Sequence, residues 1–377
     1  MRTIVNGTIL PLSVVVAVLL ATGGGCGTSP SVQPNPGSGT APNSSYSAPP
    51  GNLLTIAGYV GGEKIQLLQN ENFRRILADK YHLAIKPTKA GSIEMASGAD
   101  LTGKDFIWPS NDFAVKLFRD GNRKAGKDQI IFNSPLVIYT GWNIADGLIK
   151  QGIVEKRREG YFIVNFQKLL TMIVERKTWR DIGQDFDGKI MIRCTDPTKS
   201  NSGNMFAGLV VNTLNNGEVV DETSVESVLP KTKQLFARLG MMETSSGDIF
   251  RNFLTTGTRN SMVIGYESQI VEFIVANPKS RKLIQDTVCV LYPEPTVWSS
   301  HPIVSLNDRG DRLIEAMMDE EVQRLAWNEH GFRSGLAEIR VDKHAVQLDC
   351  IAEEIQVVTP LPGKKTFLRI LDALKEL

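Results

Sequence analysis

The sequence predicts an α/β protein in which strands and helices alternate over two doubly wound lobes. Short apolar runs of strand length, such as 53–57 and 262–266, are separated by stretches whose apolar residues recur at helical spacing, such as 166–174. This alternation is typical of mostly parallel sheets covered by helices. A body of roughly 325 residues also exceeds one ordinary domain and therefore indicates two lobes.

The N-terminus indicates export. Residues 1–25 combine Arg2 with a short apolar stretch and then Gly23-Gly24-Gly25, which together resemble a lipoprotein signal peptide followed by a lipidated Cys26. Gly23 stands where such signals usually have Leu, so an ordinary secretory signal is the alternative. Residues 26–52 after it are almost entirely Ser, Pro, Gly, Asn, Thr and Ala, and we expect a disordered tether there.

Composition narrows the possible partners. Lys and Arg number 42 against 41 Asp and Glu, with no basic block, so nucleic acid is not an expected partner. The four histidines and the remaining Cys194, Cys289 and Cys350 have no metal-ligand spacing. We therefore predict no metal and no cofactor, a monomer, and membrane contact only through the lipid anchor.

The apolar pattern places the individual elements. Strands are expected at 53–57, 82–85, 105–108, 130–132, 136–139, 190–192, 262–266 and 288–292, with Ser134-Pro135 separating two of them. Helices are expected around 73–81, 113–118, 166–174, 206–211 and 225–239, and one amphipathic helix over 313–325.

Four polar loops follow predicted strands and lead into predicted helices. In open α/β sheets ligands bind beyond the carboxyl ends of the strands, at such loops. The longest, from Thr195 to Asn204, is rich in hydroxyl and amide groups and can hold a small polar or anionic ligand at a helix N-terminus. The loops are Gly61-Gly62-Glu63-Lys64, Pro109-Ser110-Asn111-Asp112, Asp196 to Asn204, and Glu267-Ser268-Gln269.

The order of these motifs resembles that of type II periplasmic-binding-protein-like, extracellular solute-binding lipoproteins of ABC importers, distantly including the sulfate- and molybdate-binding branch. The pieces that carry the resemblance are Gly62-Glu63-Lys64, Ser134 to Tyr139, Asp196 to Gly203, Gly265 to Gln269 and Gln323 to Arg333. It implies two lobes joined by crossover strands, closing on a ligand by hinge bending. The implied boundaries are 53–138 and 267–377 for lobe 1 and 139–266 for lobe 2, with the return crossing after Tyr266.

The candidate ligand-binding residues come from the loops and the crossover strands, and each has a structural alternative. The polar residues of the loops can simply cap helices or remain solvated, and a tyrosine at a hinge can be a core residue. Gly61-Gly62 and Glu63 argue against a simple oxyanion. The candidates are Gly62, Glu63, Lys64, Ser110, Asn111, Tyr139, Asp196, Thr198, Ser200, Asn201, Ser202, Tyr266 and Glu267.

These observations favour a membrane-tethered, extracytoplasmic solute-binding protein. It would capture a small polar, in one interpretation anionic, solute and deliver it to an ABC permease. The alternative is a sensory or scaffolding lipoprotein that uses the same fold to bind a ligand or partner protein. An enzyme is not expected, because the sequence has no G-x-S-x-G nucleophile elbow, and a triad of Ser200, Asp196 and His301 has no sequence spacing to support it.

Overall fold

The computed structural model describes residues 53–377 apart from 122, 124 and 257–260. The predicted signal peptide, Cys26 and the tether lie outside the described residues. None of the helices in the described part combines the length and hydrophobicity that a bilayer crossing requires.

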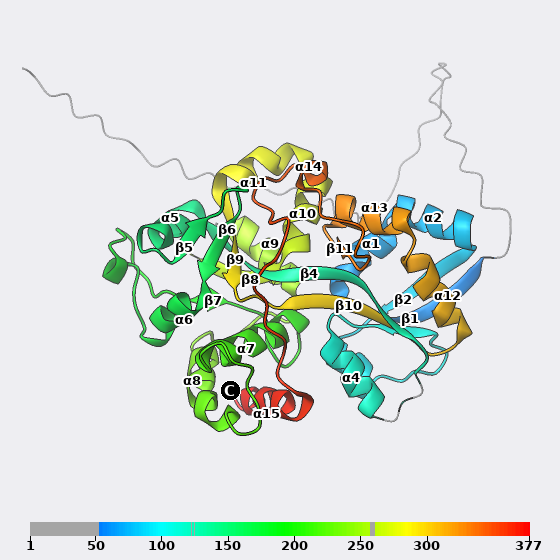
Figure 1. Cartoon of the computed structure of the whole chain (residues 1–377), viewed down its shortest axis with the longest axis horizontal. Coiled ribbons are helices and arrows are strands. Elements are labelled where there is room, and N and C mark those ends of the chain that lie inside the picture. Colours follow the sequence, from blue (N-terminus) through cyan, green and yellow to red (C-terminus); the bar gives the residue numbers. More distant parts are fainter. Residues whose placement is uncertain (1–52, 122, 124, 257–260) are drawn as a thin grey trace, which may run out of the picture. The chain divides into compact units, whose positions relative to one another are not determined.

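The described strands form one connected, mixed sheet, ordered β2-β1-β3-β10-β4-β9-β6-β5, with β8 and β11 also paired to β4 and β7 paired to β8 (Figure 1). Their bounds are β1 (Leu54–Val60), β2 (Leu83–Lys89), β3 (Phe106–Trp108), β4 (Asp128–Gly141), β5 (Val154–Lys156), β6 (Phe162–Asn165), β7 (Ile192–Arg193), β8 (Met262–Tyr266), β9 (Val288–Glu294), β10 (Trp298–Ser305) and β11 (Arg333–Ser334).

The helices of the described part alternate with these strands along the chain, and the last two follow β11. They are α1 (Ile65–Gln69), α2 (Glu71–Tyr81), α3 (Ser92–Ser97), α4 (Asp112–Asp120), α5 (Trp142–Lys150), α6 (Phe166–Val174), α7 (Asn201–Leu214), α8 (Val225–Ala237), α9 (Ser246–Thr256), α10 (Glu267–Ala276), α11 (Arg281–Thr287), α12 (Asp308–Met317), α13 (Glu320–His330), α14 (Lys343–Val346) and α15 (Lys364–Lys375), with single 3-10 turns at Gly62–Lys64, Arg180–Ile182 and Pro278–Ser280.

Strand β4 joins the two halves of the sheet. Its first half pairs antiparallel with β10 and β11, and its second half pairs antiparallel with β8 and β9. The sequence predicts two separate extended segments around Ser134-Pro135, whereas the structure has one continuous strand. Pro135 lies where β4 changes partners, and the next residue, Leu136, donates its backbone N–H to the Val297 carbonyl at 3.0 Å.

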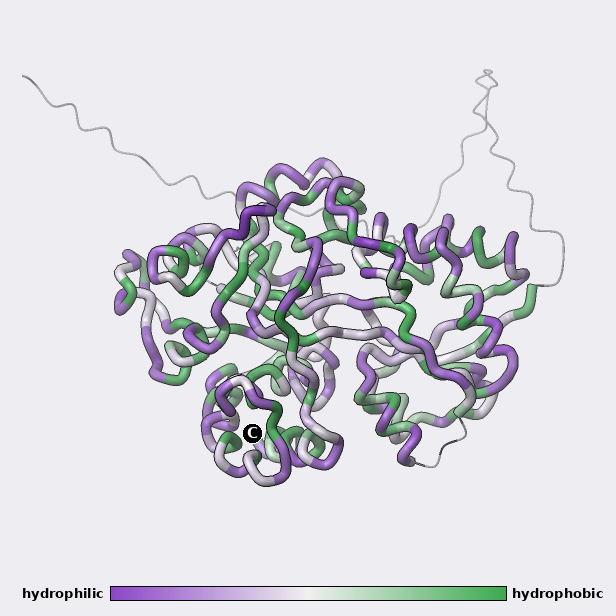
Figure 2. The backbone as a smooth tube through the Cα atoms, in the orientation of Figure 1, coloured by the Kyte–Doolittle hydropathy of each residue, from purple (hydrophilic) through white to green (hydrophobic). Residues whose placement is uncertain are grey.

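The second half of β4 is buried on both faces. Leu136 and Ile138 pack into a core with α5, α6, α7, α8 and α15, while Val137 and Tyr139 pack into another with α9 and α10. All four residues are fully buried. Because side chains alternate across a strand, helices on both faces require this continuous apolar run. Figure 2 shows hydrophilic and hydrophobic residues alternating along the helices, as expected where one face of each turns to a core.

Helices also cover the other half of the sheet. Phe106, Trp108 and Phe132 from β3 and β4 pack with apolar residues of α1, α2, α12 and α13. The α/β fold with helices on both faces is therefore confirmed, and so are the predicted positions of β1, β2, β3, β8 and β9.

Three further predictions about the elements were wrong. The sheet is mixed instead of mostly parallel, because β4 and β10 run antiparallel to their neighbours. The strand expected at 190–192 begins only at Ile192. The helix expected over 313–325 is two helices, α12 and α13, separated at Met318 and Asp319.

The return path of the chain also differs from the expectation. Strand β8, which ends at Tyr266, pairs with β4 in the same half of the sheet as β9. The chain reaches the other half only where β9 passes into β10, across residues 294–298. Helix α15 then packs against α7 and α8.

Candidate functional site

One cavity of about 580 Å³ is lined by residues from all four polar loops. The loops therefore come together as predicted, whereas binding of a solute there stays a prediction. The loop residues that line the cavity are Gly61, Gly62 and Glu63, then Ser110, then Lys199, Ser200 and Asn201, and finally Ser268 and Gln269.

Further residues that line the cavity were missed from the sequence. They are Ile65 and Gln66 of α1, Lys89 at the end of β2 with Ala90, Gly91, Ser92 and Glu94 after it, residues 244–248 and Arg251 in and before α9, Glu272 of α10, and His330 at the end of α13 with Phe332 after it. The run Thr244-Ser245-Ser246-Gly247-Asp248 has the same small, polar character as the turn from Thr195 to Asn204, so composition alone could have indicated it. No comparable signal marks Lys89 or His330.

Three helices begin at the cavity. Residues at the N-termini of α7, α9 and α10 line it, and these helices have 14, 11 and 10 residues. Ser200 is the N-cap of α7 with an extended backbone, and its side chain makes no capping hydrogen bond. The N-terminus of a helix carries partial positive charge and unpaired N–H groups. The cavity is therefore electrostatically suited to a negatively charged group.

The turn ahead of α7 is held by its own side chains. One carboxylate oxygen of Asp196 accepts hydrogen bonds from the Thr198 backbone N–H at 2.8 Å and from its hydroxyl at 2.7 Å. Lys199 forms an ion pair with Asp196 at 3.0 Å. Burial would raise the pKa of Asp196, but these bonds outweigh it and hold the pKa below its ordinary value. Asp196 and Thr198 thus shape the turn and do not line the cavity.

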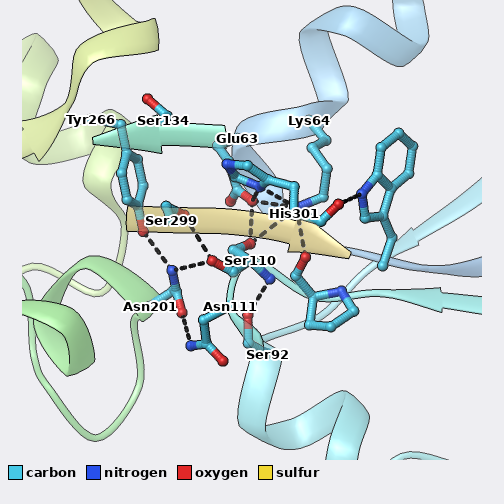
Figure 3. A network of polar contacts seen from close by, with 12 residues as sticks. Glu63, Lys64, Ser92, Ser110, Asn111, Ser134, Asn201, Tyr266, Ser299 and His301 are labelled. Atoms are coloured by element: carbon cyan, nitrogen blue, oxygen red, sulfur yellow. Dashed lines mark hydrogen bonds and ion pairs between the residues drawn. The ribbon is translucent and has the colours of Figure 1, made fainter. Parts of the chain in front are cut away.

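A buried charged group lies beneath the first loop (Figure 3). The Lys64 ammonium lies 3.0 Å from the Ser110 hydroxyl and 3.2 Å from His301 Nδ1, and it forms an ion pair with Glu63. The Ser110 hydroxyl donates to the same Glu63 carboxylate. Lys64 and His301 are fully buried. Gly61 makes this packing possible, because a Cβ there would collide with Glu63, Ser110 and Lys64.

Burial and charge together set the protonation of this group. Burial would raise the pKa of Glu63, but the nearby Lys64 and His301 outweigh it, so the pKa lies well below its ordinary value. Burial lowers the pKa of Lys64, and Glu63 partly offsets this. Burial, followed by the Lys64 charge, lowers the pKa of His301 to about 4. At neutral pH His301 is therefore uncharged beside a carboxylate–ammonium pair.

Asn201 connects the two halves of the molecule at the edge of the cavity (Figure 3). Its side-chain amide donates to the Ser110 carbonyl at 3.1 Å and to the Tyr266 hydroxyl at 2.9 Å, and its amide oxygen accepts from Asn111. Asn111 is also the N-cap of α4 and accepts from the Ala114 N–H at 2.7 Å. Residues 90 positions apart in sequence thus fix the spacing between two of the loops.

The other candidates have internal partners. Tyr139 donates to the Tyr266 carbonyl and packs on Phe250 at a ring distance of 4.8 Å. Glu267 is fully buried and forms a two-point ion pair with Arg333, at 2.7 Å for each contact. Ser202 is bonded to the Thr195 hydroxyl at 2.7 Å and Ser200 at 3.2 Å. Of these, only Ser200 lines the cavity. Lys64, Asn111 and Tyr266 do not line it either.

The charged side chains that line the cavity are mostly paired. Glu63 pairs with Lys64, Asp248 with Arg251 and Glu272 with His330. Glu94 accepts from the Gly91 backbone N–H at 3.1 Å. Within the described part of the chain, Lys89 is a lining cation with no ion pair, and its side chain lies against Gly62. Its ammonium group is therefore available to a solute.

Among the residues that the structure describes, no group of three or more His, Cys, Asp or Glu side chains is placed to hold a metal ion. Cys194, Cys289 and Cys350 are free thiols there, and the first two are buried.

Comparison with known proteins identifies the fold. No protein-family model matches the sequence. No curated protein matches it either. Among solved structures, iron-bound HitA from Pseudomonas aeruginosa is 12% identical with a TM-score of 0.55, covering 86% of this chain and 99% of its own. The apo ferric ion-binding protein A of Pasteurella haemolytica is 11% identical with a TM-score of 0.54, covering 85% and 97%.

A substrate-binding protein of an ABC transporter from Agrobacterium tumefaciens is 14% identical with a TM-score of 0.51, covering 85% of this chain and 93% of its own. At such identities the likeness concerns the fold. The chain has the fold of type II periplasmic-binding-protein-like proteins, as the order of its motifs predicts.

Proposed function

We propose that this protein is an extracytoplasmic, membrane-tethered receptor of an ABC importer. It binds a small organic acid in the 580 Å³ cavity and catalyses no reaction. The observation that carries the proposal is the meeting of three helix N-termini and the glycine turn 61–62 at that cavity. The volume lies within the range of about 300–1,000 Å³ that is typical of small-molecule sites.

The charges favour an acid that also carries hydrogen-bond donors. The helix N-termini and Lys89 attract a carboxylate or a comparable anion. Glu63 remains ionised beside Lys64 and can accept a hydrogen bond from a hydroxyl or amino group of the same solute. A small organic acid that carries a hydroxyl or amino group can satisfy both the helix N-termini with Lys89 and the Glu63 carboxylate.

Iron is a less suitable ligand for this cavity. HitA is described as iron-bound, but the described residues of this chain offer no cluster of metal-ligating side chains. Tyr266 is nearly fully buried and receives a hydrogen bond from Asn201, and burial raises the pKa of its hydroxyl. Deprotonation of the Tyr266 hydroxyl to a phenolate that could bind iron would therefore cost free energy.

Capture and delivery of a solute require the two halves of the molecule to move relative to each other. The two halves of the sheet are joined by β4 and by the passage from β9 to β10, which can act as hinge segments while the cavity opens and closes. We propose that the halves act as two lobes, in place of the boundaries 53–138, 139–266 and 267–377, and that a lipidated Cys26 holds the body at the membrane near its permease.

A thermal-shift screen tests the binding. Anions, sugars, amino acids and hydroxy acids are added to the full chain, and a ligand at a hundred times its Kd should raise the melting temperature by about 5 °C. The variant Lys89→Gln should weaken an acidic ligand about tenfold, while Lys86→Gln, three residues earlier on the same strand and exposed, should leave its affinity unchanged. A panel without any shift would contradict the proposal.

A further inference from the structure

A second cavity, of about 300 Å³, is lined by residues in or next to α6, β7, α7 and α8. Figure 1 labels these four elements. None of the residues that line it also lines the larger cavity. Seven of the ten lining residues are apolar, among them Ile173, Phe206, Leu235 and Leu239. The wall of this cavity is thus mainly aliphatic and aromatic, in contrast to the hydroxyl-rich wall of the first.

The other three lining residues are cations, Arg176, Lys189 and Arg238, and no carboxylate lines the cavity. Arg176 and Lys189 are exposed, and none of the three forms an ion pair with a residue that the structure describes. The nearby Arg176 charge adds to burial in lowering the pKa of Arg238. The like charges therefore repel one another in the absence of an anion.

Helix capping explains only part of this arrangement. Arg238 follows α8 and donates through Nη1 to the Ile173 carbonyl near the end of α6, at 3.1 Å, as cations near helix C-termini commonly do. Its Nε is buried, however, and has no hydrogen-bond partner in the described part of the molecule. A buried donor without a partner costs free energy. An anionic ligand at the cavity could supply that partner.

We propose that this second cavity binds an amphipathic anion, namely an aliphatic chain that ends in a carboxylate. The apolar wall would take the chain, and Arg176, Lys189 and Arg238 would surround the carboxylate. At roughly 30 Å³ for each water-sized group, the volume accommodates about ten non-hydrogen atoms. The ligand class is therefore a medium-chain fatty acid. This inference is independent of the function proposed for the larger cavity.

A chain-length series tests the apolar part. Hexanoate, octanoate and decanoate are titrated calorimetrically into the full chain in detergent-free buffer. Each additional buried methylene should tighten binding about fourfold, until the cavity is full and the gain stops. Equal affinities across the series, or no binding at all, would overturn the proposal.

Charge variants test the polar part. Arg238→Gln and Arg176→Gln should each weaken decanoate binding ten- to a hundredfold and leave 1-decanol binding unchanged, because only the carboxylate uses the guanidinium groups. Lys168→Gln removes one charge from the exposed side of α6 and serves as the matched control.

Two outcomes of these variants are decisive. Arg176 is exposed, so Arg176→Gln keeps the test valid if Arg238→Gln fails to fold. If decanoate and 1-decanol weaken equally in the arginine variants, or if Lys168→Gln weakens decanoate as much as they do, the cations do not form a carboxylate site. Lys89→Gln should not affect decanoate, which separates this cavity from the first.

Discussion

Among single residues, Glu63, Lys64 and His301 form a largely buried electrostatic group. Lys64 is fully buried, and the side chain of Glu63 is 11% exposed. A buried ion pair contributes little net stability compared with apolar residues, but removal of one partner leaves an uncompensated charge. Replacement of either Glu63 or Lys64 alone should therefore destabilise the fold more than replacement of both.

Replacing Lys64 alone should be strongly destabilising. Lys64→Met leaves the Glu63 carboxylate without its cation, and we expect a loss of about 3–5 kcal/mol in the free energy of unfolding. The double variant Glu63→Gln with Lys64→Met should recover a large part of the loss. Urea unfolding followed by tryptophan fluorescence measures both, and a single variant as stable as the parent would contradict the assignment.

His301 should make stability depend on pH. Its folded pKa of about 4 lies below the ordinary 6.5, so the unfolded chain binds more protons between these values. Stability should therefore fall by about 3 kcal/mol as the pH drops from about 6.5 to about 4. The depressed pKa of Glu63 acts at lower pH, because its contribution to stability is lost only as the pH falls below its ordinary 4.5. Urea unfolding at a series of pH values measures this, and His301→Gln should remove most of the fall in the free energy of unfolding between about pH 6.5 and 4. An unchanged pH dependence in this variant would argue against a neutral, buried His301.

Secondary-structure elements were predicted well where apolar runs are long and poorly where polar residues are buried. Strand β10 carries Ser299, Ser300 and His301 into the interior, so no apolar run marks it. The break between α12 and α13 was missed for a different reason. The apolar spacing continues across it, and only Asp319, which caps α13, shows where the second helix begins.

Asp319, which lies between α12 and α13, should contribute to the stability of the fold. Its carboxylate accepts from the Glu321 N–H at 2.8 Å and from the Tyr81 hydroxyl at 2.7 Å, which ties the start of α13 to α2. Asp319→Ala should lower the free energy of unfolding by about 1–2 kcal/mol, and Asp319→Asn, which keeps a capping oxygen, by less. Chemical unfolding of the two variants side by side checks this, and equal losses would show that capping is not the main contribution.

For the molecule as a whole, the sequence predicts which loops meet but not how they are held. Polar turns after strands identify Gly61-Gly62, Ser110 and Asn201, because the edge of an α/β sheet brings such turns together. The contact of Lys64 with His301 joins residues 237 positions apart. It depends on β10 returning between β3 and β4, and no local pattern reveals that order.

The C-terminal helix is the clearest test of cooperativity across the body. In α15, Phe367 is fully buried and meets Phe113 of α4 edge-on at a ring distance of 4.9 Å, while the helix also packs against α7 and α8. Phe367→Ala should cost about 3–5 kcal/mol, because it leaves a cavity among three helices from distant parts of the chain. Arg369→Ala removes only an exposed ion pair with Glu226, which solvent screens, and should leave the free energy of unfolding nearly unchanged.

If α15 belongs to the same cooperative unit, circular dichroism and tryptophan fluorescence should report the same lowered midpoint for Phe367→Ala. Separate midpoints, or a cost no greater than that of Arg369→Ala, would show that the helix unfolds on its own.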